Sequence, residues 1–102
     1  MSNYYVLRDK QAIPVDDVRV WGRAFEKDRV VRQETLPNGL FVSTVFLGID
    51  HGWSEQKPLI FETMVFPSEA DLNELDMERY STWEEAEQGH QEMVEKWRNQ
   101  WV

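Results

Sequence analysis

Residues 59–66 read LIFETMVF, and residues 40–49 read LFVSTVFLGI. Both stretches are rich in β-branched and aromatic residues, which favour strands, and both carry large apolar side chains on odd and even positions alike. A strand that is apolar on both of its faces needs cover on both. The two stretches therefore predict a central pair of strands that the rest of the chain must bury.

Three further stretches with strand character precede this pair: Tyr4–Leu7, Val18–Glu26 and Arg29–Leu36. The dipeptide Lys27–Asp28 separates two alternating runs, and Pro37-Asn38-Gly39 separates the next two, where Asn-Gly readily supplies the positive φ angles of a tight hairpin. Short turns of this kind join antiparallel strands. We therefore expect a meander of four main strands, or of five if the first stretch joins it.

The two longer polar segments of the chain lie on either side of the last predicted strand. Residues 50–58 contain Gly52 and Pro58, which are poorly suited to a central strand, and residues 67–78 are rich in acidic and turn-forming residues. We predict an exposed loop over residues 50–58 and a long loop or a frayed turn over residues 67–78.

A helix is predicted from Thr82 to Arg98. Ser81 and Glu84 fit a capping box at its start, in which a hydroxyl and a carboxylate satisfy backbone N–H groups. Apolar positions then recur at three- and four-residue spacing and form a stripe that can lie on a sheet. The stripe consists of Trp83, Ala86, His90, Met93, Val94, Trp97 and Trp101.

Together these elements predict one α+β domain over residues 1–102, with an antiparallel four- to five-stranded meander sheet and one C-terminal helix packed on a face. Alternation along the central strands groups Leu40, Val42, Phe46, Ile60, Met64 and Phe66 on one face and Phe41, Val45, Leu47, Phe61 and Val65 on the other. One helix covers only one face. The N-terminal segment or residues 67–79 could cover the second, but we expect a homodimer to do so.

Composition narrows the range of functions. The chain has 102 residues, no cysteine and a formal net charge of −8, so disulfides, thiolate metal sites and cysteine nucleophiles are excluded. Residues 67–102 carry ten acidic and three basic residues, a net charge of −7. This surface repels phosphate backbones and favours basic partners. Without an apolar run of membrane-spanning length, we expect a cytoplasmic protein that binds neither nucleic acid nor membrane.

Motifs for catalysis and for cofactors are absent. The chain contains no G-x-S-x-G elbow, no Walker loop and no G-x-G-x-x-G, so an enzymatic role is disfavoured and no cofactor is expected. Imidazole and carboxylate side chains could bind a divalent metal if the helix packs over the strands. The weak candidates for such a site are Asp50, His51, Glu62 and His90.

Glu62 is the only charged residue in its predicted strand. A buried carboxylate costs several kcal/mol unless it is paired, so Glu62 needs Arg23, Arg32 or Arg79 as a partner. The pair could be structural, or it could lie on the floor of a ligand-binding cleft with aromatic walls. The candidate ligand-binding residues for that cleft are Trp21, Arg23, Asp50, His51, Trp53, Glu62, Arg79 and Tyr80.

Three stretches carry a resemblance: VSTVFLGIDH at 42–51, FETMVF at 61–66, and RYSTWEEAE at 79–87 followed by Gly89-His90. Together they resemble a family of short, uncharacterised proteins of bacteriophages and prophages, over roughly residues 18–96. The resemblance implies a phage-encoded accessory product and carries no site residue or activity with it.

Three functions remain as hypotheses. The first, which we favour, is a non-enzymatic interaction or inhibitory module that binds a host or phage protein with a basic surface. The second is a small-ligand protein that holds a nucleotide-like molecule in an aromatic cleft. The third is a metal-assisted hydrolase that uses Asp50, His51, Glu62 and His90.

Overall fold

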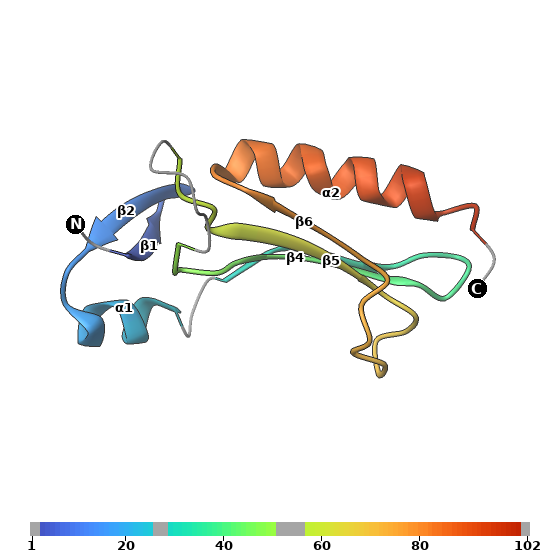
Figure 1. Ribbon diagram of the computed structural model, residues 1–102, viewed down its shortest axis with the longest axis horizontal. Helices are drawn as coiled ribbons and strands as arrows, with labels where there is room; N and C mark the ends of the chain where they lie inside the picture. The colour runs from blue at the N-terminus through green and yellow to red at the C-terminus, as the bar shows by residue number, and fades with distance from the viewer. Residues whose placement is uncertain (1–2, 26–28, 51–56, 101–102) are drawn as a thin grey trace.

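The computed structural model describes residues 3–25, 29–50 and 57–100 (Figure 1). It contains an antiparallel four-stranded sheet in the order β3-β4-β5-β6, a separate two-stranded sheet, and a C-terminal helix that packs on the larger sheet. The predicted α+β fold is confirmed. The elements are β1 Tyr4–Arg8, β2 Gln11–Val15, α1 Val18–Phe25, β3 Val30–Thr35, β4 Phe41–Phe46, β5 Phe61–Phe66, β6 Asp76–Tyr80 and α2 Trp83–Trp97.

The core lies between α2 and one face of the four-stranded sheet. The register of the two central strands places Val42 opposite Val65 and Phe46 opposite Phe61, and all four side chains are buried. Our grouping of the apolar side chains is therefore wrong for four residues of β5: Phe61 and Val65 share the face of Val42 and Phe46, and Met64 and Phe66 share the face of Phe41 and Val45. The other face carries Phe41, Val45, Met64 and Phe66, which remain half-buried.

Helix α2 begins and ends with side-chain caps. Thr82 accepts a hydrogen bond from the N–H of Glu85, whose carboxylate accepts one from the N–H of Thr82. The capping box therefore exists one residue later than Ser81 and Glu84. At the other end, the Nδ2 atom of Asn38 donates to the carbonyl oxygens of Trp97 and Gln100. The predicted stripe lies on the sheet as far as Trp97, and Trp101 is outside the described residues.

The predicted strand Val18–Glu26 is wrong, because residues 18–25 form α1. The helix starts after Asp17, whose carboxylate accepts a hydrogen bond from the N–H of Arg19 and whose carbonyl accepts one from the N–H of Trp21. An Asp in this position is a typical N-cap. The alternation of Val and Arg along the segment fits an exposed helix as well as a strand, and the cap decides between them.

The sheet nevertheless has four strands, because β6 is added at the other edge, beside β5. It begins within the segment 67–78, which we predicted as a long loop or a frayed turn, and runs on to Tyr80. Its sequence, DMERY, is mostly charged, as an edge strand tolerates. The Pro37-Asn38-Gly39 turn is confirmed: Gly39 has a φ of 90°, and Leu36 N–H donates to Leu40 O at 2.8 Å.

The N-terminal stretch forms a hairpin of its own instead of joining the sheet as a full strand. β1 pairs with β2 through a two-residue turn in which Asp9 and Lys10 both have positive φ. The hairpin reaches the end of β4 through a Tyr5 N–H to Gly48 O bond of 2.8 Å. The ammonium of Lys10 also lies over the ring of Trp83, which links the hairpin to the start of α2.

No helix in the described part of the chain has both the length and the apolar character needed to cross a bilayer.

Gly89 provides a sharp test of how α2 sits on β6. A methyl group there would collide with the ring of Tyr80. Gly89→Ala should therefore lower the free energy of unfolding, although alanine favours a helix over glycine by about 1 kcal/mol. In a Tyr80→Ala background the same change should instead raise the free energy of unfolding by about 0.5–1 kcal/mol. Urea unfolding of the four proteins measures both signs, and stabilisation in both backgrounds would contradict the packing.

Candidate functional site

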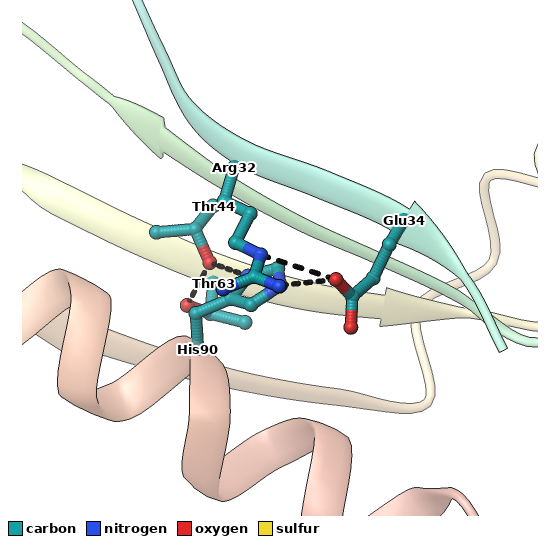
Figure 2. Close-up of polar contacts among 5 residues, drawn as sticks. All are labelled: Arg32, Glu34, Thr44, Thr63 and His90. Atoms are coloured by element: carbon teal, nitrogen blue, oxygen red, sulfur yellow. Dashed lines mark hydrogen bonds and ion pairs between the residues drawn. The ribbon is translucent and has the colours of Figure 1, made fainter.

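A chain of polar side chains crosses the core between α2 and the sheet (Figure 2). The hydroxyls of Thr44 and Thr63 lie 2.5 Å apart, and the Thr44 hydroxyl is also 2.6 Å from Nδ1 of His90. On the far side of the imidazole ring, Nε2 lies 3.7 Å from Oε2 of Glu34. That same oxygen accepts a hydrogen bond from Nε of Arg32 at 3.1 Å. We refer to these five residues as the His90 chain.

The secondary structure explains why these five side chains meet. Thr44 on β4 pairs with Thr63 on β5 and also with Arg32 on β3, so all three point to the face that α2 covers. Glu34 lies two residues beyond Arg32 and shares its face. His90 comes down from the buried side of α2, where the glycine before it leaves room for a close approach to the sheet.

Burial favours the neutral form of the His90 imidazole. Its exposed fraction is 0%, and this burial lowers the pKa of His90 below its ordinary value. The Glu34 carboxylate opposes the shift and the Arg32 guanidinium adds to it. One of the ring nitrogens then carries the proton, and Nε2 has no hydrogen-bond partner within the described residues.

The order hydroxyl, imidazole, carboxylate is also that of nucleophilic hydrolases, but burial decides against this use here. Thr44 and His90 are both inaccessible to solvent, so a substrate has no route to the hydroxyl. A buried hydrogen bond between a helix and a sheet forms only when the two elements are packed in the right position, and Thr44 and Nδ1 of His90 form such a bond. The His90 chain is therefore suited to set the position of α2 on the sheet.

Glu62 is paired, as the sequence analysis requires, and its partner is Arg79. Oε2 of Glu62 accepts from Nε of Arg79 at 2.9 Å, and the Glu62 side chain is only 8% exposed. The pair joins β5 to β6 on the face that points away from α2, because Glu62 alternates with the helix-facing Phe61 and Thr63. Of the three candidate arginines, the adjacent strand supplies the partner.

The remaining ligand-binding candidates are spread over the molecule. Tyr80 lies under α2 at Gly89, on the face opposite Arg79. Trp21 and Arg23 are on α1, where Nε1 of Trp21 donates to Gly48 O at 2.8 Å. Oδ1 of Asp50 accepts from the N–H of Leu59 at 3.0 Å. His51 and Trp53 lie outside the described residues.

The weak metal candidates that lie within the described residues do not come together in one site. Glu62 and His90 lie on opposite faces of the sheet, and His51 is outside the described residues. Within residues 3–25, 29–50 and 57–100, no three His, Asp or Glu side chains form a group that could hold a metal ion.

The surface between β6 and α2 is hollowed and strongly acidic. Two adjacent hollows, of about 350 Å³ and about 410 Å³, share Tyr80, Gly89 and Glu92 in their walls, and we refer to them together as the acidic groove. Its lining residues are Asp76, Glu78, Tyr80, Glu84, Glu85, Gln88, Gly89, Glu92, Met93 and Lys96.

Some carboxylates of the acidic groove have partners within the protein and others do not. Burial raises the pKa of Asp76, but its carboxylate accepts hydrogen bonds from Nζ of Lys96 at 2.7 Å and from Nε1 of Trp97 at 2.9 Å, and together these lower the pKa below its ordinary value. The carboxylate of Glu85 is used by the helix cap. Glu78 and Glu84 form no ion pair with any described residue. The groove therefore keeps negative charge that its own residues do not neutralise.

The acidic charge of residues 67–102 could be predicted from the sequence, but the groove that some of these residues line could not. Without β6, Asp76 and Glu78 belonged to a loop with no fixed position relative to the helix. The usable signal was alternation in DMERY, where Asp76, Glu78 and Tyr80 share a face. The His90 chain was missed for a different reason, since it depends on the register of β4 and β5.

No family model, curated protein or solved structure matches the chain. The residues and their geometry are therefore the basis for inferring its function, and the origin suggested by the resemblance to phage proteins stays a prediction.

The His90 chain predicts a pH dependence of stability. The unfolded imidazole has an ordinary pKa near 6.5 and the folded one has a lower pKa, so below about pH 6.5 the unfolded chain binds more protons. The free energy of unfolding should be unaffected by His90 above that pH and should fall as the pH drops through it. Urea unfolding at about pH 7.5 and about pH 5.5 measures the decline.

A His90→Gln variant supplies the control, because its amide can still hydrogen-bond to Thr44 but does not titrate. Carboxylates titrate in both proteins, so the difference between the two pH dependences isolates His90. Equal declines in the two proteins would contradict the assignment.

Proposed function

We propose that this protein is a non-enzymatic interaction module that binds a basic segment of a partner protein in the acidic groove between β6 and α2. The observation that supports this most directly is the uneven charge of the groove: five of its lining residues are acidic, and Lys96 is the single basic one. The ammonium of Lys96 is already engaged by Asp76. A cationic side chain that enters the groove would meet Glu78, Glu84 and Glu92.

Shape strengthens the electrostatic argument. Carboxylates on a flat surface are well hydrated and gain little from one counter-ion. In a groove with a tyrosine ring and a helix backbone on its walls, less water lies between the charges and the field is stronger. Tyr80 also offers an aromatic wall for the alkyl part of a lysine or for an arginine plane.

The other two hypotheses receive less support. A nucleotide carries phosphates, which an acidic groove repels, and the predicted aromatic residues Trp21 and Tyr80 belong to separate elements, α1 and β6. A metal-assisted hydrolase needs ligands that converge, and Glu62 and His90 do not. That the partner is a host or phage protein, and that the chain forms a homodimer, remain predictions.

Binding to a defined cationic probe tests the proposal. The probe is a fluorescent, acetylated and amidated peptide of about eight lysines, measured by anisotropy at about 50 mM and about 300 mM NaCl. The double variant E78Q/E92Q should bind about two- to thirtyfold more weakly than the unmodified protein, since each partly exposed charge pair contributes about 0.2–1 kcal/mol. Affinity should fall as salt rises.

The matched control is E69Q/E95Q, which removes the same charge from two exposed residues that do not line the groove. It should bind nearly as well as the unmodified protein. If the two double variants weaken binding equally, the peptide responds to net charge alone and the groove is not the site.

A further inference from the structure

We propose that the partner segment binds as an added strand along the free edge of β6, with basic side chains directed into the acidic groove and apolar side chains on the opposite face. This inference rests on the proposed function and specifies how the acidic groove is used. Strand addition is an established way for a sheet to bind an extended peptide, in which backbone hydrogen bonds supply affinity and alternate side chains supply specificity.

The first argument comes from the sheet itself. In the order β3-β4-β5-β6, β6 pairs with β5 on one side, and no described strand pairs with its other side. The opposite edge strand, β3, is interrupted by a register shift between Val30 and Arg32, a feature that hinders the pairing of a further strand. The pairing of β6 with β5 runs from Asp76 to Tyr80 without such a shift. Of the two edges, β6 is the regular one.

The second argument comes from the two faces of β6. Asp76, Glu78 and Tyr80 point to α2 and line the acidic groove. Met77 lies on the opposite face and is 38% exposed, and Leu75, just before the strand, is equally exposed. An added strand would place successive side chains on these two faces in turn. The fitting sequence therefore alternates basic and apolar residues.

Charge also selects the occupant. Two copies of β6 paired edge to edge would bring Asp76 and Glu78 of one chain close to the same acids of the other, and like charges on neighbouring strands are destabilising. A basic strand turns that repulsion into attraction. The acidic residues of β6 therefore disfavour self-pairing and leave the edge open to a strand of opposite charge.

The experiment uses an acetylated and amidated peptide of about eight residues in which lysine and valine alternate, together with two N-methylated forms. One form carries N-methyl groups on every valine and the other on every lysine. Only alternate amides of an added strand face its neighbour, so one set of methyl groups blocks pairing with β6 and the other points away. One form should bind at least about tenfold more weakly than the other. Because the changes are in the peptide, folding of the protein is not affected.

Strand addition is wrong if the two N-methylated peptides bind within about twofold of each other. In that case, the affinities of the unmethylated peptide for E78Q/E92Q and for E69Q/E95Q are compared. Weaker binding to E78Q/E92Q would identify the acidic groove as the binding site and would disprove only the added strand. If neither pair of measurements shows a difference, the proposed function fails as well. Sedimentation equilibrium of the protein alone tests the competing occupant: a dimer that the alternating peptide dissociates would place a second copy on the edge and overturn the proposal.

Discussion

The contact between His90 and Thr44 is the interaction on which the rest of the structure depends. It is formed at the centre of the buried layer, where α2 crosses the two central strands, and both residues are inaccessible to solvent. Apolar packing alone tolerates small slides of a helix along a sheet, whereas a buried imidazole has to meet its hydroxyl. Once this contact is made, Gly89 lies on Tyr80 and the two walls of the acidic groove stand at their observed separation.

Helix α2 could be predicted because two independent signals agree on it. A capping pattern marks its start, and apolar residues recur at helical spacing as far as Trp97. The residues of α1 lack such agreement, since Val and Arg alternate there at the spacing of a strand while Asp17 acts as a helix cap. β6 was not predicted as a strand because most of its residues are charged. Local pattern identifies an element reliably only when capping, period and polarity indicate the same structure.

The need of Glu62 for a basic partner could be predicted from the sequence. The His90 chain could not, because it depends on the register between two strands. Glu62 required a basic partner on energetic grounds, and Arg79 on the neighbouring strand supplies one. The His90 chain depends instead on Thr44 facing Thr63, and a shift of one residue between β4 and β5 would turn Thr63 to the other face. The link between these strands, residues 47–60, holds no periodic pattern that sets this register.

The side chain of Asn38 has a consequence for how the protein folds. Its amide group caps the last carbonyls of α2 from the turn between β3 and β4, about sixty positions earlier in the chain. The final turn of the helix therefore gains its cap only after the β3–β4 hairpin has formed and its turn has packed against the C-terminal end of α2. A contact between such distant parts of the sequence cannot stabilise the helix early in folding, when only local structure has formed. It makes the end of the helix and the hairpin form together, which favours a single cooperative folding transition over a helix that forms by itself.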